Sequence, residues 1–224
     1  MQGRQSNMYD KLLQLPLFQG MSESDWSYVV GHTRFEFERI SAGNTPIHEG
    51  DRCSSICILI KGQLFGESVA DDHSYKVIET YHAPLILQPG NLFGLTQRYS
   101  QSFTTATSCE FLRLSKEETL KISDNFEVFR INLLNTITTY AQRHARRPWH
   151  VPPSSLRGKI IRFVSDRCRI PAGQKLVVIK MEQLATMIGT SRLNLSRELH
   201  SMENEGLIAL RRGEFEIFSL QSLL

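Results

Sequence analysis

A short stretch near the C-terminal end carries the side chains best suited to bind nucleic acid. Residues 191 to 200 read SRLNLSRELH, and Ser191 is a natural N-cap for a helix. At about 100° per residue, Leu195 and Leu199 share one face, and the opposite face is mainly polar. Arginine is the commonest bidentate reader of guanine, and an exposed leucine can pack on a thymine methyl group. The predicted DNA contacts of this helix are Ser191, Arg192, Leu193, Asn194, Ser196, Arg197 and His200.

The residues around this helix predict a helix-turn-helix. Leu184 and Ile188 form an apolar ridge on a preceding short helix. Gly189 permits a tight turn because glycine adopts positive φ without steric cost. Gly206 is expected to end the second helix, with Leu207 folded back toward it. In a helix-turn-helix the second helix enters the major groove of DNA.

The sequence LIALRRGEFEIF at 207 to 218 alternates as a strand, a turn and a second strand. This pattern predicts a wing beside the helix-turn-helix. Arg211 and Arg212 lie at its tip, where they are suited to phosphate contacts, which position a protein without specifying sequence. The alternative is a small helical packing module whose charges are merely solvated.

Charge is distributed unevenly along the 224 residues. The total of 26 Lys and Arg against 23 Asp and Glu gives +3. Residues 1 to 123 hold 11 basic and 14 acidic side chains, and residues 124 to 224 hold 15 and 9. An acidic half with net −3 is therefore joined to a basic half with net +6, where a polyanion would bind. The ordinary composition, 41% hydrophobic and 22% charged, excludes a disordered or collagen-like chain.

Nothing in the sequence predicts a membrane span or a disulfide framework. The longest apolar runs, such as ICILI at 56 to 60, are too short to cross a bilayer, and the start lacks a signal-peptide core. We expect a cytoplasmic protein with no membrane partner. Cys53 and Cys57 could form a redox or metal pair, but two sulfurs do not complete a metal site. We expect both to pack as small hydrophobic residues, with no metal and no cofactor.

Residues 35 to 114 contain many short β-like runs separated by Gly, Asp and Asn turns. This texture predicts a compact antiparallel barrel or roll. Two short helical groups precede it between 9 and 31, broken at Pro16 and Gly20, and Ser22 is a plausible N-cap for the second.

A long helix is predicted over 124 to 147, followed by a proline-rich hinge at 148 to 154. Side chains that recur at steps of three and four form one seam along the helix. A long helix with one such apolar stripe needs a partner surface. A second copy of the chain is the simplest partner, and packing against the chain's own barrel is the alternative. The predicted dimer contacts are Phe126, Leu133, Ile137 and Tyr140.

These features together resemble the CRP/FNR superfamily of bacterial transcription regulators over nearly the whole chain. The stretch IGTSRLNLSRELHSMENEGLI at 188 to 208 is the most specific. The weaker family-like stretches follow in order: PLFQGMSE at 16, IHEGD at 47, ICILIKGQL at 56 and PGNLFGL at 89. The resemblance implies an α+β fold with a cyclic-nucleotide-binding-type β-roll at 1 to 123, a dimerisation helix at 124 to 147, and a winged helix-turn-helix at 155 to 224.

The resemblance also implies a homodimer that binds a near-palindromic operator in double-stranded DNA and regulates transcription. RNA polymerase is a further candidate partner, and no enzymatic activity is expected. Ser191, Arg192 and Arg197 fall on family positions that contact phosphate or bases. Leu193 replaces a base-reading Glu of the best-known member, and Lys180 replaces a capping Thr or Ser, where its charge could reach a DNA phosphate.

The resemblance breaks down at the effector pocket. Cyclic-AMP-binding members hold the ribose and phosphate with a Gly-Glu pair and an Arg-Ser pair. Here these positions read Gly94-Leu95 and Tyr99-Ser100. A buried cyclic phosphate without a cation would be poorly compensated, so we expect an effector other than cyclic AMP, or none. The alternative is a cyclic-nucleotide sensor that uses Arg98.

Other sensing chemistries have little support in the sequence. An iron-sulfur sensor would need an N-terminal cysteine cluster, and a haem sensor would need an axial ligand, for which His32, His48, His73 and His82 qualify only by residue type. Two alternatives come from other classes. One is a cupin-like metal enzyme with a fused helical domain, which would need converging His and carboxylate ligands. The other is a pure protein-interaction module.

Overall fold

The computed structural model describes residues 12–145 and 151–224, which form two compact units. Among the described residues, the first unit comprises 12–64 and 81–145, and the second comprises 65–80 and 151–224. The fold is α+β, with antiparallel strand pairing in both units. The first part of the predicted hinge, 148 to 150, lies outside the described residues. None of the helices among the described residues is long and apolar enough to span a bilayer.

The first unit is built on a four-stranded antiparallel sheet in the order β1-β7-β2-β5. Its strands are β1 (Phe35–Ile40), β2 (Ser55–Lys61), β5 (Leu85–Leu87) and β7 (Cys109–Ser115), and β6 (Ser102–Thr105) lies in the chain between β5 and β7. Consecutive residues are buried in both central strands, Phe111 and Leu112 in β7 and Cys57 and Ile58 in β2, because these strands are covered on both faces. The short strands predicted between 35 and 114 are therefore present.

Two short N-terminal elements precede the sheet, η1 (Pro16–Phe18) and α2 (Glu23–His32). Ser22 caps α2 as predicted, because its Oγ accepts a hydrogen bond from the Asp25 N–H at 3.1 Å. The Asp25 carboxylate in turn accepts a hydrogen bond from the Ser22 N–H at 3.3 Å, which completes a capping box. Phe18 and Trp26 pack edge to face with ring centroids 5.2 Å apart, which fixes both elements on the core.

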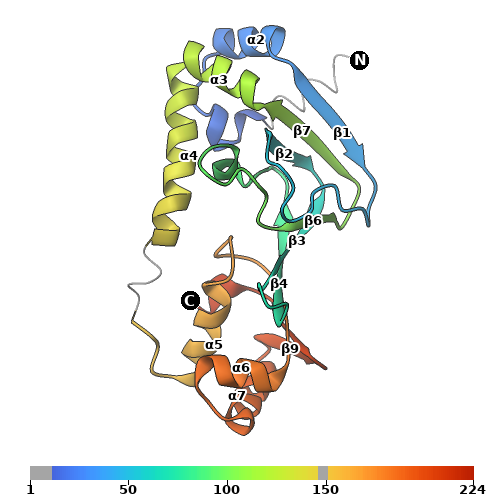
Figure 1. The fold of residues 1–224 in the computed structure, drawn as a ribbon, viewed down its shortest axis with the longest axis vertical. Coiled ribbons are helices and arrows are strands. Elements are labelled where there is room, and N and C mark those ends of the chain that lie inside the picture. Colours follow the sequence, from blue (N-terminus) through green and yellow to red (C-terminus); the bar gives the residue numbers. More distant parts are fainter. Residues whose placement is uncertain (1–11, 146–150) are drawn as a thin grey trace. The chain divides into compact units, whose positions relative to one another are not determined.

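Most of the predicted helix over 124 to 147 is α4 (Glu127–Ala145), whereas 124 and 125 end the preceding helix α3 (Lys116–Asn125). Residues 146 and 147 lie outside the described residues. Figure 1 shows α4 turning away from α3 and running along one side of the first unit. Phe126 is the break between them, with an extended φ of −128°, so it lies on no helical seam. Its ring packs on Tyr28, with centroids 5.7 Å apart. The sequence prediction missed this break because Phe126 continues the apolar spacing of α4.

The predicted dimer seam is also only partly available at the surface of α4. Leu133 is 5% exposed, and its neighbour Phe129, fully buried, packs on Phe18 at 5.5 Å between centroids. Leu133 therefore belongs to the core of its own unit, and its placement among dimer contacts is wrong. Ile137 and Tyr140 are half-buried, and Tyr140 lines a cavity of about 590 Å³ together with residues of η1 and β5.

The second unit contains a winged helix-turn-helix. Its elements after residue 150 are α5 (Leu156–Ser165), β8 (Lys175–Ile179), α6 (Met181–Ile188), α7 (Arg192–Asn204), β9 (Ile208–Arg211), β10 (Glu214–Ile217) and η4 (Leu220–Ser222). The predicted apolar faces of α6 and α7 meet in one core, in which Leu184, Leu195, Leu199 and Met202 are each at most 1% exposed. β8 pairs with β10, and β10 pairs with β9.

One segment from the first half of the sequence also belongs to the second unit. The hairpin of β3 (Gln63–Val69) and β4 (Tyr75–His82) lies largely within residues 65–80, and β4 pairs antiparallel with β8. Val77 of β4 is 1% exposed in the same core as α5, α6 and α7. The sheet of this unit therefore has the order β3-β4-β8-β10-β9. The domain boundaries that we expected from the sequence did not include this contribution.

Candidate DNA-binding interface and effector pocket

The turn between α6 and α7 is held by two residue-specific features. Gly189 adopts φ +68°, in the left-handed region, and ends α6. The N–H of Thr190 then donates to the Ala185 carbonyl at 2.9 Å. Ser191 caps α7 by accepting from the Asn194 N–H at 3.2 Å. The predicted glycine turn and serine cap are thus confirmed, and they fix the direction in which α7 begins.

The other end of α7 is equally well defined. Gly206 takes φ +72°, its N–H donates to Glu203 O at 2.9 Å, and the Leu207 N–H donates to Met202 O at 3.0 Å. This pair of bonds is the Schellman motif expected from the sequence. The helix therefore has fixed ends, and its polar face has a defined orientation.

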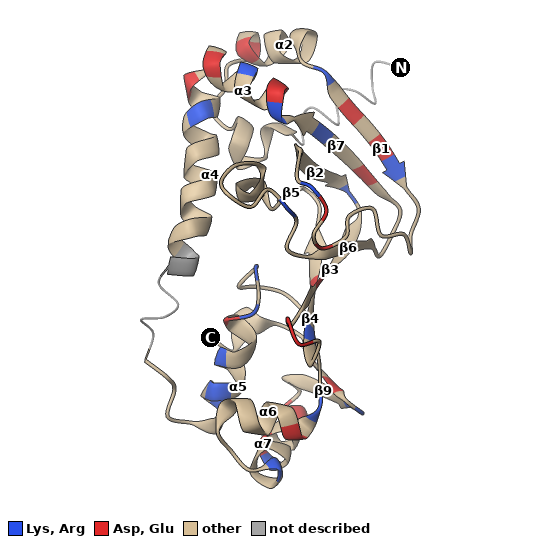
Figure 2. Cartoon of the chain, in the orientation of Figure 1, with Lys and Arg blue, Asp and Glu red and all other residues tan. Residues whose placement is uncertain are grey.

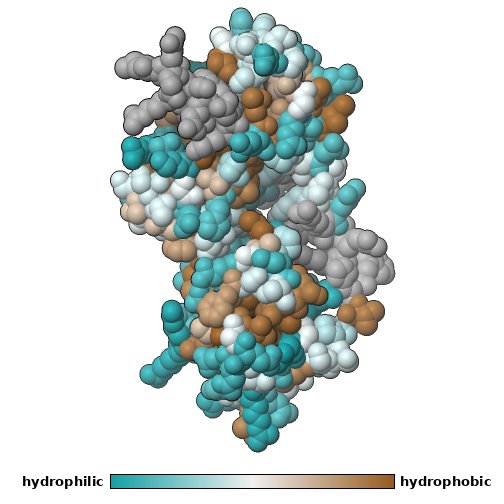
Figure 3. All heavy atoms as spheres, turned by 180° about the vertical axis from the view of Figure 1, so that it is seen from behind, coloured by the Kyte–Doolittle hydropathy of each residue, from teal (hydrophilic) through white to brown (hydrophobic). Residues whose placement is uncertain are grey.

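That polar face is open to solvent along its length. Arg192, Leu193, Asn194, Arg197 and His200 are all exposed, and Leu193 has 59% of its surface accessible. Ser196 is half-buried. Figure 2 marks positions of basic residues in blue on α7, and Figure 3 shows a largely hydrophilic surface over this end of the unit with isolated apolar atoms. The arrangement can present hydrogen-bond donors and one apolar side chain to a groove.

The two arginines of α7, Arg192 and Arg197, differ in their surroundings. Arg197 makes no ion pair with any residue that the structure describes. Arg192 faces Glu182 of α6, with Nη1 and Oε1 3.4 Å apart and both side chains more than two-thirds exposed. Such an exposed pair contributes little, and a DNA phosphate or guanine can replace the carboxylate. Sequence reasoning missed Glu182 because only the fold brings it beside a residue ten positions later.

The wing adds a second basic group beside α7. Arg211 and Arg212 are exposed at the turn between β9 and β10. Together with His200 they line a hollow of about 310 Å³ between α7 and the wing. Arg211 Nη1 lies 3.5 Å from the Glu214 carboxylate, which orients its side chain along the sheet. Lys180 is exposed at the N-terminus of α6 and makes no capping bond with its side chain, as the sequence predicted.

A further contact positions α7 from behind. Arg157 at the start of α5 donates from Nε to Glu198 at 2.8 Å and from Nη1 and Nη2 to the two oxygens of Glu205 at 2.8 and 2.5 Å. The two carboxylates raise the pKa of Arg157, with Glu205 the stronger contributor. This fork joins the middle and the end of α7 to α5. No sequence pattern indicated it, because the three residues are far apart along the chain.

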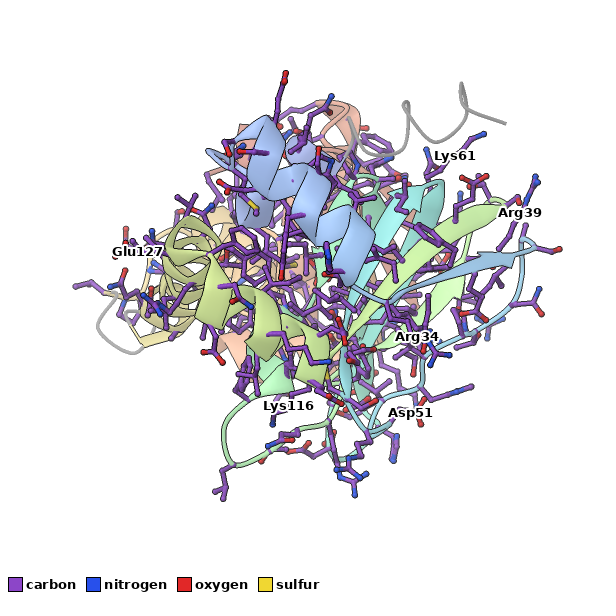
Figure 4. The ribbon with its side chains drawn as sticks, turned by 90° about the horizontal axis from the view of Figure 1, so that it is seen from above. Arg34, Arg39, Asp51, Lys61, Lys116 and Glu127 are labelled. Carbon is purple, nitrogen blue, oxygen red and sulfur yellow. The ribbon has the colours of Figure 1, made fainter. Side chains whose placement is uncertain are left out.

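In the first unit, the predicted effector pocket residues do not surround a common point. Leu95 is fully exposed, and Arg98 points to the surface, where its Nη1 donates to the Gly50 carbonyl at 2.7 Å. Tyr99 is 4% exposed, and Gly94 adopts φ +86° in an exposed turn. Figure 4 shows other charged side chains of this unit, such as Arg39 and Lys61, directed outward.

Ser100, one of the predicted pocket residues, belongs to a network of hydrogen bonds between side chains of the protein. The N–H and Oγ of Ser100 both donate to Gln88 Oε1, at 2.9 and 3.1 Å, and Asn91 Nδ2 donates to the same oxygen at 2.8 Å. Gln88 Nε2 donates to Gln101 Oε1, which also accepts from the Tyr81 hydroxyl at 2.9 Å. Sequence reasoning missed Gln88 and Gln101 because an uncharged amide carries no recognisable binding pattern.

The four cysteines of the chain are buried and carry free thiols, Cys53 and Cys57 among them. Burial raises the pKa of Cys57 to about 11. No group of three or more His, Cys, Asp or Glu residues in the described parts of the chain is arranged to hold a metal ion.

Comparison with known proteins agrees with this geometry. Residues 158–224 match the sequence family described as the Crp-like helix-turn-helix domain, which covers α6, α7 and the wing. The chain is thus similar to the CRP/FNR superfamily of transcription regulators. It is a DNA-binding regulator of this type, and the matched segment contains every residue that the sequence predicted to contact DNA.

Relatives match over most of the chain. The cAMP-activated global transcriptional regulator Vfr of Pseudomonas aeruginosa is 22% identical over 194 residues, which are 80% of this chain and 88% of Vfr. The cAMP-activated global transcriptional regulator CRP of Haemophilus influenzae is 24% identical over 183 residues, 79% of this chain and 81% of that protein. The sensor domain of the regulator DNR from P. aeruginosa has a similar fold, with a TM-score of 0.54 and 16% identity over 70% of this chain and all of that domain.

Proposed function

We propose that this CRP/FNR-type regulator acts as a homodimer that reads a near-palindromic operator through α7 and the wing. The observation that carries the proposal is the exposed polar face of α7 between two fixed ends, with Arg197 held by no carboxylate among the described residues. Arg192 and Arg197 read base edges, Leu193 packs on a thymine methyl group, and Ser191 binds a phosphate. Lys180, Arg211 and Arg212 add phosphate contacts from α6 and the wing.

We further propose that α4 supplies the dimer contact through a stripe different from the one first expected. Val128, Ile131 and Leu134 are 40%, 47% and 55% exposed, and Thr138 continues the stripe one turn later. Apolar side chains exposed at this spacing need a covering surface, and the equivalent stripe of a second copy would provide one. The two α7 helices would then enter successive major grooves, because dimer symmetry matches operator symmetry.

The first unit is proposed to carry a degenerate effector pocket that does not respond to cyclic AMP. Gln88 already satisfies the N–H and hydroxyl of Ser100, and Arg98 is bonded to Gly50 at the surface. A cyclic phosphate would have to displace these bonds and would gain no buried cation in return. The protein is proposed to work without catalytic activity, in the cytoplasm where its DNA lies, with RNA polymerase as a further partner.

The test is DNA binding by the Arg197→Ala variant. The probe is a duplex selected by the wild-type protein from a random-sequence library. Loss of a bidentate guanine contact costs about 1 to 3 kcal/mol, so we expect affinity to fall roughly 5- to 150-fold. Arg39→Ala, which removes an exposed arginine of the first unit, is the matched control and should bind like the wild type. Equal affinity of Arg197→Ala and wild type would contradict DNA reading by α7 and favour a protein-interaction role.

A further inference from the structure

Counted from β9, β4 is the fourth strand of the sheet that contains the wing. It pairs with β8 from Tyr75 opposite Ile179 to Glu79 opposite Lys175. Across β8 and β10 the register continues into the wing, so that one row of residues runs Lys76, Val178, Glu214, Arg211. The edge of β8 that faces away from the wing is therefore covered by a strand from residues 65–80, rather than left as an open edge.

Glu79 is the most strongly held residue of this strand. Its side chain has no exposed surface, and neither has that of Lys175. Oε1 lies 3.0 Å from Lys175 Nζ and accepts from the Ile170 N–H at 3.0 Å, while Oε2 accepts from the Arg169 N–H at 2.8 Å. Lys175 Nζ also donates to the Ala172 carbonyl at 2.9 Å. The carboxylate thus fixes the loop before β8 and the first residue of β8 together.

Contacts at the other end of β4 hold the strand in the same register. Arg167 Nε donates to the Tyr75 hydroxyl at 2.9 Å, and its guanidinium lies 3.9 Å from the centroid of Phe163. The rings of Tyr75 and Phe163 pack edge to face at 5.5 Å between centroids. Val77 fills the core between the two polar clusters. A shift of β4 by one residue would turn Val77 and Glu79 to the opposite face, so the pairing has one register.

We propose that Glu79, although distant in sequence from the helix-turn-helix, is a positioning residue for the wing. It holds Lys175 and the start of β8, β8 holds β10 by backbone pairing, and β10 ends in the turn that carries Arg211 and Arg212. A buried ion pair that loses one partner leaves an uncompensated charge, so loss of the Glu79 charge displaces Lys175 and loosens β8. This inference rests on the proposed phosphate contacts of the wing, but not on base reading by α7.

The experiment compares Glu79→Gln with Glu67→Gln in the full-length chain. Glu67 lies on the same hairpin and pairs with Lys76 at 2.8 Å, but both side chains are more than one-third exposed, so the same chemical change there is the matched control. Binding to the duplex selected by the wild-type protein is measured over a range of salt concentrations. We expect Glu79→Gln to bind about tenfold more weakly and to reduce the salt slope by about one, as loss of one phosphate contact does. Glu67→Gln should match the wild type.

A double-mutant cycle with Arg212→Ala separates positioning of the wing from general loss of stability. If Glu79 acts through the wing, Glu79→Gln should weaken binding far less in the Arg212→Ala background than in the wild type. Equal losses in both backgrounds, or a Glu79→Gln variant with wild-type affinity, would overturn the inference. Failure of the wild type to select any DNA would instead refute the proposed function.

The double variant Glu79→Gln/Lys175→Met tests whether weaker DNA binding by Glu79→Gln is only the result of a folding defect. This pair removes both buried charges and leaves an amide oxygen to accept from a backbone N–H, so no uncompensated charge remains. We expect the combined variant to recover most of the DNA affinity, together with slow hydrogen exchange in β8 and β10. A combined variant that regains slow exchange but binds as weakly as Glu79→Gln would also overturn the inference.

Discussion

At the scale of single residues, the side chains that face DNA and those that fill the cores follow opposite rules. Arg197 and Leu193 are informative because they are exposed and Arg197 has no ion-pair partner in the described part of the chain, whereas Cys57 is informative because it is completely buried. Cys57 lies opposite Arg113 in the pairing of β2 and β7, and burial keeps its thiol protonated. Its ionisation should therefore be coupled to unfolding.

We expect Cys57 to make the protein less stable in alkaline solution. The folded pKa, about 11, exceeds the ordinary value of 9.0, so the stabilising contribution is complete below pH 9 and is lost as the pH rises from 9 to 11. Two pKa units correspond to roughly 2 to 3 kcal/mol. The measurement is the free energy of unfolding of the wild type minus that of Cys57→Ala at several pH values. A difference that stays constant from pH 8 to 11 would contradict the prediction.

At the scale of elements, α7 is a helix that is fixed at both ends and also joined to α5. Ser191 caps one end, the Schellman motif closes the other, and the Arg157 fork joins the helix to α5. None of these contacts uses the exposed polar face of the helix, so that face is free to carry residues suited to DNA contact.

The two proposed roles of Ser191 can be separated by substitution. Ser191→Ala removes the cap and should lower the free energy of unfolding by about 1 kcal/mol, measured by denaturant titration. Ser191→Asp retains a capping acceptor, so stability should stay close to wild type, but its charge repels a phosphate and DNA affinity should fall sharply. If Ser191→Asp binds DNA like the wild type, Ser191 does not contact a phosphate.

The stripe on α4 predicts which substitutions separate the two copies. Ile131→Glu or Leu134→Glu should convert the dimer to monomers at micromolar concentration in analytical ultracentrifugation, because a carboxylate would be buried in an apolar interface. Lys61→Glu, at the exposed end of β2, changes the charge equally outside α4 and should leave the dimer intact. Dimers in both α4 variants would place the interface elsewhere.

At the scale of the whole molecule, two units share one chain that crosses between them more than once. The chain enters the second unit at residue 65, leaves it after residue 80 and returns at 147. The hairpin is therefore flanked in the chain by the first unit, while its strand β4 pairs with β8 in the sheet of the wing. A change in the first unit has two covalent routes to the second, the hairpin and the segment after α4.

The pocket geometry predicts how the whole protein responds to nucleotides. We expect calorimetric titration with cyclic AMP or cyclic GMP to give no binding at micromolar concentration, since Gln88 occupies the Ser100 donors and Arg98 lies at the surface. The cAMP-activated relative Vfr is the positive control. Micromolar binding that is lost in Arg98→Ala would establish the cyclic-nucleotide alternative instead.

The sequence by itself determined the helix-turn-helix, because its signals are local. Gly189, Ser191 and Gly206 act through backbone conformation and hydrogen bonds within a few residues, and the apolar spacing of α7 orients its exposed face. The same local logic identified Ser22 as a cap and the wing as a hairpin.

Only the tertiary structure decided which surfaces are left for partners and which contacts cross the chain. Periodicity placed Leu133 on a seam but could not tell a partner helix from the chain's own core, since both bury the same side chain. It also could not show that Phe126 precedes the start of α4 or that Gln88 accepts the hydrogen bond of the Ser100 N–H. Glu79 and Lys175 lie 96 residues apart, and their pairing depends on strand order, which no local pattern encodes.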